Sequence, residues 1–228
     1  VREEMVTKIV ALFPRHQRRW LPEPRPTRAP RRGRPASVTR VDLLVVGAST
    51  GGPNALAELV GALPAPLPVP GLIVQHMPPV FTGFLADRLH RLGMHAVSEA
   101  RDGEPLEAGH IYVAPGGRHL EVAQAGATAA ARLHDGPPEN SCRPAVDVLF
   151  RSAVDCCGGH VLGVVLTGMG RDGLLGCRRI KEAGGQVISQ DEASSVVWGM
   201  PGWVAREGVT DAVLPLAEIG PEVARRVR

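Results

Sequence analysis

Residues 43–53 read LLVVGASTGGP, and this stretch decides the fold class. Its first four residues form an unbroken apolar run, which is typical of a strand buried on both faces of a parallel sheet. Small polar and glycine residues follow at once, and Pro53 then stands where the first turn of a helix tolerates proline. The stretch therefore predicts a buried strand, a tight glycine-rich loop and a helix over residues 53–63.

The same succession of strands and helices continues along the chain. Further buried strands are predicted at residues 72–74, 161–166 and 186–189. Further helices are predicted at residues 81–92, 144–157, 173–183, 202–207 and 217–227. Residues 95–133 lack a helical period, and their short runs at 111–114, 119–123 and 129–133 predict antiparallel hairpin strands. The predicted fold is α/β, a doubly wound, mostly parallel sheet with helices on both faces and an antiparallel hairpin insertion.

The first forty residues differ in composition from the rest. Residues 2–12 have the period of a short amphipathic helix, and residues 14–40 contain six prolines and nine arginines, which predicts an extended, solvated linker. Residues 1–40 hold 11 of the 26 Lys and Arg but only 3 of the 23 Asp and Glu. The folded part, predicted over residues 41–228, is therefore not basic, and we expect no nucleic-acid partner. Binding of nucleic acid by the basic linker is the alternative.

Composition restricts the class of protein further. Hydrophobic residues make up 44% of the chain, enough for a packed core, but no apolar run approaches the roughly 20 residues of a membrane span. No charged-then-apolar leader opens the chain, so we expect a soluble, cytoplasmic protein without membrane insertion. The cysteines show no C-x-x-C spacing, and we expect reduced core thiols; they are Cys142, Cys156, Cys157 and Cys177.

Three polar residues follow three of the predicted buried strands. Ser49, His76 and Asp172 each lie in the loop after such a strand. Because parallel strands point the same way, these loops should meet at the carboxyl edge of the sheet, where such folds bind ligands. A hydroxyl, an imidazole and a carboxylate can act as nucleophile, general base and orienting group. Taken singly, a helix cap, a structural histidine and a turn residue are the simpler interpretations; their coincidence at three strand ends favours a catalytic triad.

The loop around Ser49 also matches other motifs in part. It fits G-x-S-x-G between a strand and a helix, but the order Ser49, His76, Asp172 differs from the Ser, Asp/Glu, His order of α/β-hydrolases. A dinucleotide site is disfavoured because Ser49 stands at the second glycine of the fingerprint and no acidic residue ends the next strand. A Walker-type phosphate-binding loop is also disfavoured, because no Lys-Ser/Thr pair follows the glycines.

Six ordered segments of the sequence resemble the catalytic domain of the chemotaxis protein-glutamate methylesterases, the CheB family. They read VGASTGGP from residue 46, IVQHMP from 73, IYVAPGG from 111, RPAVDVLF from 143, LTGMGRDG from 166, and QDE to GMP between 190 and 201. The resemblance covers nearly all of the predicted folded part. It implies that Ser49, His76 and Asp172 are the nucleophile, the base and the orienting carboxylate.

The resemblance also implies a substrate and partners. The substrate would be glutamate methyl esters on the cytoplasmic helices of a methyl-accepting chemoreceptor, with deamidation of receptor glutamines as a related activity. Family members usually carry a receiver domain before the catalytic domain. Residues 1–13 would then be the remnant helix of a truncated receiver-like domain, residues 14–40 the linker, and residues 41–228 the methylesterase catalytic domain.

Three expectations and two alternatives complete the hypothesis. The backbone amides of Thr50 and Met169 are the candidate oxyanion donors, and no metal or organic cofactor is expected. Cys142 stands where the family has a histidine, a departure that is not expected to touch the triad. A small-molecule serine esterase and a non-catalytic interaction module remain the alternatives.

Overall fold

The computed structural model describes residues 40–126 and 128–227. Its main sheet has seven strands in the order β3-β4-β2-β1-β7-β8-β9, and every neighbouring pair is parallel. These strands are β1 Leu43–Ala48, β2 Gly71–Gln75, β3 Ala96–Glu99, β4 His110–Val113, β7 Val161–Val165, β8 Gln186–Gln190 and β9 Ala212–Leu214. A separate antiparallel hairpin consists of β5 His119–Ala125 and β6 Thr128–His134.

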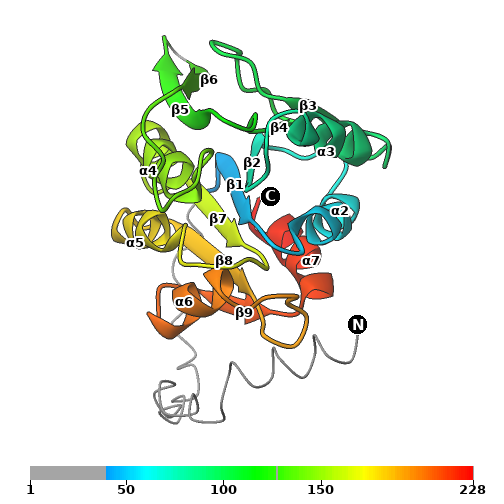
Figure 1. Ribbon diagram of the computed structural model, residues 1–228, viewed down its shortest axis with the longest axis vertical. Helices are drawn as coiled ribbons and strands as arrows, with labels where there is room; N and C mark the ends of the chain where they lie inside the picture. Colours follow the sequence, from blue (N-terminus) through cyan, green and yellow to red (C-terminus); the bar gives the residue numbers. More distant parts are fainter. Residues whose placement is uncertain (1–39, 127, 228) are drawn as a thin grey trace, which may run out of the picture. The chain divides into compact units, whose positions relative to one another are not determined.

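Helices cover both faces of the sheet, as the ribbon shows (Figure 1). They are α2 Gly52–Ala62, α3 Phe81–His90, α4 Val146–Cys157, α5 Leu174–Glu182, α6 Met200–Arg206 and α7 Leu216–Arg226. Alternate residues of β1 enter two different cores: Leu44 and Val46 pack with α2, α3 and α7, whereas Leu43 and Val45 pack with α4, α5 and α6. The α/β fold with helices on both faces is confirmed. None of the helices in the described residues is long and apolar enough to cross a membrane.

The prediction for residues 95–133 was wrong in one respect. The hairpin β5–β6 is present, but the run at residues 111–114 is not part of it: β4 pairs in parallel with both β2 and β3 inside the main sheet. Ile111, Tyr112 and Val113 are all buried, as in a strand covered on both faces. The strands β3 and β9 were not predicted, because β3 has a single fully buried residue and β9 has none. The predictions for residues 1–39 lie outside the described part of the chain.

Candidate active site

The three central strands bring the three predicted site residues to one edge of the sheet. Ser49 follows β1, His76 follows β2, and Asp172 lies in the loop between β7 and α5. The strand order β2-β1-β7 makes these three strands neighbours. After β1 the chain moves to β2 on one side and later returns to β7 on the other, so the edge lies at a topological switch point, where open α/β sheets bind ligands.

His76 and Asp172 form a buried pair, although they lie 96 positions apart in the sequence. The Nε2 atom of His76 is 2.7 Å from the Oδ2 atom of Asp172. The two side chains are only 13% and 3% exposed. With the carboxylate ionised, Nε2 carries the proton that it donates to Asp172, which leaves Nδ1 as the ring nitrogen able to accept a proton.

The carboxylate of Asp172 accepts hydrogen bonds from four further donors. The first two amides of α4, those of Val146 and Asp147, donate to its two oxygens at 2.7 and 3.0 Å. The amide of Gly173 and the Nδ2 atom of Asn140 donate to Oδ1, both at 3.0 Å. Burial alone would raise the pKa of Asp172, but these bonds and His76 outweigh it, and the pKa lies below its ordinary value. Asp172 is therefore an ionised, fixed acceptor for the imidazole.

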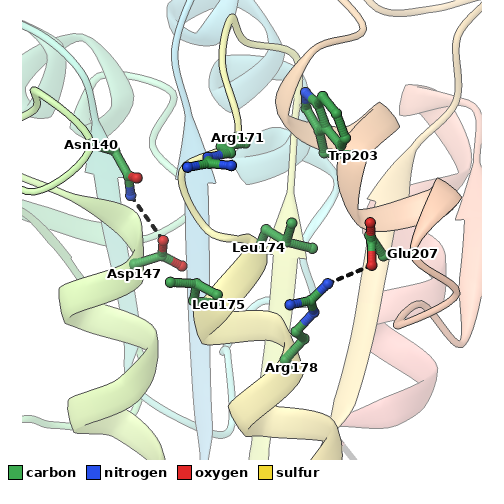
Figure 2. A pocket seen from close by; sticks show the side chains of 8 residues that line it. All are labelled: Asn140, Asp147, Arg171, Leu174, Leu175, Arg178, Trp203 and Glu207. Carbon is green, nitrogen blue, oxygen red and sulfur yellow. Dashed lines mark hydrogen bonds and ion pairs between the residues drawn. The ribbon is translucent and has the colours of Figure 1, made fainter.

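A second buried carboxyl, Asp147, lies behind Asp172. Its Oδ2 atom accepts a bond from Nδ2 of Asn140 at 2.9 Å, and its Oδ1 atom accepts one from the amide of Gly176 at 2.7 Å. Burial, together with the charge of Asp172, raises the pKa of Asp147 to about 6. Figure 2 shows the adjoining pocket, with Asn140 and Asp147 on one side and Trp203 and Glu207 on the other. Asn140 thus bridges the two carboxyls at the wall of this pocket.

Removing the bridge should weaken catalysis without removing a triad residue. Asn140→Ala deletes both amide bonds, so Asp172 loses one of its fixed donors and gains freedom to move relative to His76. We expect kcat for the predicted ester hydrolysis to fall roughly 10- to 100-fold, because small displacements of reacting groups have effects of that size. Steady-state kinetics check this, and a kcat equal to that of the unaltered chain would show that the bridge does not position Asp172.

The environment of His76 favours its protonated form. Burial lowers the pKa of the imidazole, but the hydrogen bonds and charges of Asp172 and Cys142 raise it by more, and the resulting pKa is about 9. A histidine with this pKa is a stronger base than one in water. It is also protonated at neutral pH in the free protein, so only a small fraction is in the form that can accept a proton.

Ser49 is fixed through its backbone. Its amide donates to the carbonyl of Thr167 at 3.0 Å, across to the loop after β7. Gln75 links Ser49 to His76, because Nε2 of Gln75 donates to the backbone carbonyl of Ser49 at 2.9 Å and to that of His76 at 3.1 Å. A side chain at Gly168 would come within 2.8 Å of the Ser49 Cβ, which explains the glycine there. Ser49 does not cap α2, whose N-cap is Gly51 in the left-handed conformation at φ 82°.

The structure does not join the Ser49 hydroxyl to the imidazole by a hydrogen bond. Among the described residues, this hydroxyl makes no side-chain hydrogen bond at all, whereas Nδ1 of His76 lies 3.6 Å from the Sγ atom of Cys142. The expectation that Cys142 leaves the triad untouched was therefore wrong. The reason is a tight turn at Asn140 and Ser141, which brings Cys142 back beside Glu139 and over the imidazole. Bonds to a catalytic serine are often long before substrate binds and tighten afterwards.

The two candidate oxyanion donors are available for a ligand. Thr50 and Met169 lie on the loops after β1 and β7, and Thr50 and the Met169 side chain are exposed. Within the described residues, the amides of Thr50 and Met169 make no backbone hydrogen bond. The two loops are joined by Thr167, whose Oγ1 donates to the carbonyl of Thr50 at 2.9 Å. Two free amides thus lie on adjoining loops at the same edge as Ser49.

Three side chains of the site are of types that bind transition metals. One ligand atom each from His76, Cys142 and Asp172 lie within 4.8 Å of one another. Hydrogen bonding accounts for the arrangement, because Nε2 of His76 and Oδ2 of Asp172 are already bonded to each other at 2.7 Å. The expectation that the site needs no metal or cofactor stays a prediction.

Four residues that contact the predicted triad were not predicted from the sequence to do so: Gln75, Asn140, Cys142 and Asp147. Gln75 directly precedes His76, and its burial at a strand end next to a candidate base was a usable signal. Asp147 is a buried acid in the first turn of a helix. The contacts of Asn140 and Cys142 had no such signal, since they depend on a turn at Asn140 and Ser141 that begins 32 positions before Asp172.

A buried His–Asp pair beside a serine on a G-x-S-x-G loop, at the switch point of a parallel sheet, is typical of α/β enzymes that hydrolyse acyl groups. A family model described as CheB methylesterase matches residues 44–223. The chain therefore belongs to the CheB methylesterase family.

Relatives and a solved structure support this assignment. A protein of Nocardioides sp. is 51% identical over all of this chain, and one of Rhodopseudomonas palustris is 53% identical over 84% of it. Both are named protein-glutamate methylesterase/protein-glutamine glutaminase. The crystal structure of the Thermotoga maritima CheB methylesterase catalytic domain has a TM-score of 0.79 and 39% identity, and covers 81% of this chain and 98% of that one. The chain spans 63% and 50% of the lengths of the two relatives.

Proposed function

We propose that this chain hydrolyses glutamate methyl esters on the cytoplasmic helices of chemoreceptors, as a serine hydrolase. The observation that carries the proposal is the buried bond between His76 and Asp172 at the edge where Ser49 follows β1. Membership of the CheB methylesterase family supports the choice of substrate. The names of the relatives support deamidation of receptor glutamines as a second activity of the same site.

In the proposed mechanism, the Ser49 hydroxyl attacks the carbonyl carbon of the side-chain ester while Nδ1 of His76 accepts its proton. Asp172 stabilises the imidazolium through its bond to Nε2. The carbonyl oxygen becomes an oxyanion that the amides of Thr50 and Met169 bind; a single donor of this kind contributes about 2.7–4 kcal/mol in comparable sites. His76 then protonates the departing methanol, and water hydrolyses the acyl-serine with His76 acting again as base.

The pH dependence of the reaction follows from the raised pKa of His76. Only the neutral imidazole can take the Ser49 proton, and its pKa is about 9. The value of kcat/KM should therefore rise about tenfold per pH unit from about pH 5 to about pH 8 and level off above about pH 9. Methanol release, corrected for spontaneous hydrolysis at each pH, measures this. A flat profile over the same interval would contradict the role of His76.

The substrate class is tested by comparing two esters. We expect the chain to hydrolyse a methylated receptor cytoplasmic fragment far faster than a short soluble methyl ester at equal ester concentration. Equal rates would favour the alternative of a small-molecule serine esterase. No release of methanol from either would favour a non-catalytic interaction module. Release of ammonia from a receptor fragment with glutamine at the same positions tests the deamidase activity.

One charge at the edge suits an acidic substrate helix. Arg171 lies directly before Asp172 and lines the pocket beside it. Among the described residues its guanidinium forms no ion pair, unlike Arg178, which pairs with Glu207. Arg171 is thus free to pair with a carboxylate next to the methylated glutamate. This interaction is part of the proposal and predicts weaker binding at high salt.

The domain assignment is also a proposal. Residues 41–228 form the catalytic domain, in agreement with the family match over residues 44–223. Residues 1–13 belong to a receiver-like domain and residues 14–40 to its linker, with a receiver domain as regulatory partner and the cytoplasm as the location. Both residue ranges lie almost wholly outside the described part of the chain, and the family resemblance is their support.

A further inference from the structure

Cys142 owes its place in the site to a turn whose backbone conformation is unusual. Asn140 and Ser141 both have positive φ, at 50° and 62°, as in the two-residue turns that join antiparallel segments. Glu139 and Cys142 flank the turn and exchange two backbone hydrogen bonds of 3.1 and 2.8 Å. Non-glycine residues in this conformation persist where the surroundings hold them. The turn therefore presents the Cys142 side chain in a defined direction.

Side-chain bonds anchor the same turn at both ends. Glu139 accepts two bonds from the guanidinium of Arg151 on α4, at 2.6 and 2.7 Å. Asn140 donates to Asp147 and Asp172 at 2.9 and 3.0 Å. The position of Cys142 is thus set by the carboxylates and the helix that also position the triad. The thiol is a fixed part of the site.

The Cys142 thiol contacts the ring nitrogen of His76 that is not bonded to Asp172. Sγ of Cys142 lies 3.6 Å from Nδ1 of His76, whose Nε2 is bonded to Asp172 at 2.7 Å. A thiol, an imidazole and a carboxylate in this succession form the arrangement that activates cysteine nucleophiles. The side chain of Cys142 is half-buried, so a small reagent in solvent can reach it. A neighbouring base that takes the thiol proton produces the thiolate, which is the reactive species.

The other three cysteines lack such a partner. Cys177 is fully buried, and burial raises the pKa of its thiol well above the ordinary value. Burial, together with Cys156, raises the pKa of Cys157 to about 12. Cys156 is half-buried and bonds weakly to Oε1 of Gln124 at 3.5 Å. In the described part of the chain, Cys142 is the only cysteine whose thiol contacts an imidazole.

We propose that Cys142 is a modification site for low-molecular-weight disulfides, and that its modification blocks the base of the active site. When His76 is neutral, the thiol gives its proton to Nδ1, and the resulting thiolate attacks one sulfur of the disulfide. A mixed disulfide forms at Sγ as the sulfur–sulfur bond of the reagent breaks. The leaving thiolate keeps the electron pair and takes up the proton. Cys142 is oxidised and half of the reagent is reduced, so atoms and electrons balance.

The consequence for catalysis rests on the proposed role of His76. A group attached to Sγ lies against Nδ1, the nitrogen that must accept the Ser49 proton. The mixed disulfide should therefore abolish ester hydrolysis, and reduction should restore it. In Cys142→Ser, the ratio of the activities after and before treatment with the disulfide should stay near one. The chemical reaction of the thiol is measured without any ester, so it is tested separately from the esterase activity.

The test uses dithiodipyridine on the folded chain, with thiopyridone release followed by absorbance and the modified residues mapped by mass spectrometry. We expect Cys142 to react about tenfold or more faster than the half-buried Cys156 and Cys157, with the buried Cys177 reacting only on unfolding. His76→Gln should slow the reaction of Cys142 about tenfold, because the proton acceptor is lost. The matched control His110→Gln, at a histidine bonded to Ser98 on β3, should leave this rate unchanged.

Three results would overturn the proposal. They are a Cys142 that reacts no faster than Cys156, a rate that His76→Gln does not alter, and a fully modified chain whose esterase activity persists. The first comparison is made within the unaltered chain, so it stands even if a variant fails to fold.

Discussion

Ser49→Ala is expected to lower methanol release from a methylated receptor fragment by about 10⁶-fold, the loss seen when a serine hydrolase loses its nucleophile. The substitution removes one oxygen from a half-buried side chain that makes no hydrogen bond among the described residues. The fold should therefore be unaffected, and the thermal midpoint should match that of the unaltered chain. A loss this large without unfolding can only come from the chemistry of the hydroxyl.

The chain offers a matched control for this variant. Ser98 on β3 bonds through Oγ to Nε2 of His110 at 2.8 Å, so it is also a serine paired with a histidine, but on an edge strand that β4 and β2 separate from β1. Ser98→Ala should leave methanol release within a few-fold of the unaltered chain. If Ser49→Ala released methanol at nearly the normal rate, Ser49 would not be the nucleophile.

Asp172→Asn is the variant with the second largest expected effect. The new amide would donate to Nε2 of His76 in place of accepting from it, so the ring proton would move to Nδ1, the nitrogen that must accept the Ser49 proton. We expect kcat to fall about 10⁴-fold, as in serine hydrolases whose aspartate is converted to asparagine. The loss of the carboxylate also removes the main attraction that raises the pKa of His76, so the pH profile of the residual activity should shift to lower pH.

Asp211→Asn is the control for this second variant. Asp211 directly precedes β9, and its carboxylate accepts bonds from the amide of Val187 at 2.7 Å and from Lys181 at 2.6 Å. It therefore resembles Asp172 in its bonding but lies at the amino end of a strand, away from the site. A normal pH profile in Asp172→Asn, or an equal loss in Asp211→Asn, would contradict the role assigned to Asp172.

The structure brings the three predicted site residues to one edge of the sheet, whereas part of the surrounding sheet was predicted wrongly. Unbroken apolar runs mark β1, β2 and β7 as buried parallel strands, and parallel strands bring the residues after them to one edge. Ser49, His76 and Asp172 could therefore be selected from the sequence by their chemical types together with their positions. The edge strands β3 and β9 bury too few side chains to leave such a pattern. For β4, the apolar run is visible in the sequence. Because this run lies close to the hairpin in sequence, it was wrongly predicted to pair within the hairpin.

The contact between Cys142 and His76 could not be predicted for a different reason. It depends on two consecutive residues, Asn140 and Ser141, adopting positive φ values that nothing in their side chains requires. It also depends on the ion pair of Glu139 with Arg151, which forms only once α4 has packed. Tertiary contacts therefore decide which thiol reaches the base. The spacing of residues in the sequence therefore does not predict that Cys142 contacts His76.

His76 and Asp172 are proposed to activate Ser49, and covalent labelling tests this activation directly. A serine-directed phosphonate probe should add once to the folded chain, with the adduct mapped to Ser49 by mass spectrometry, and labelling should become much slower in Asp172→Asn. An unlabelled chain, or an adduct at Cys142 with Ser49 unmodified, would contradict the claim.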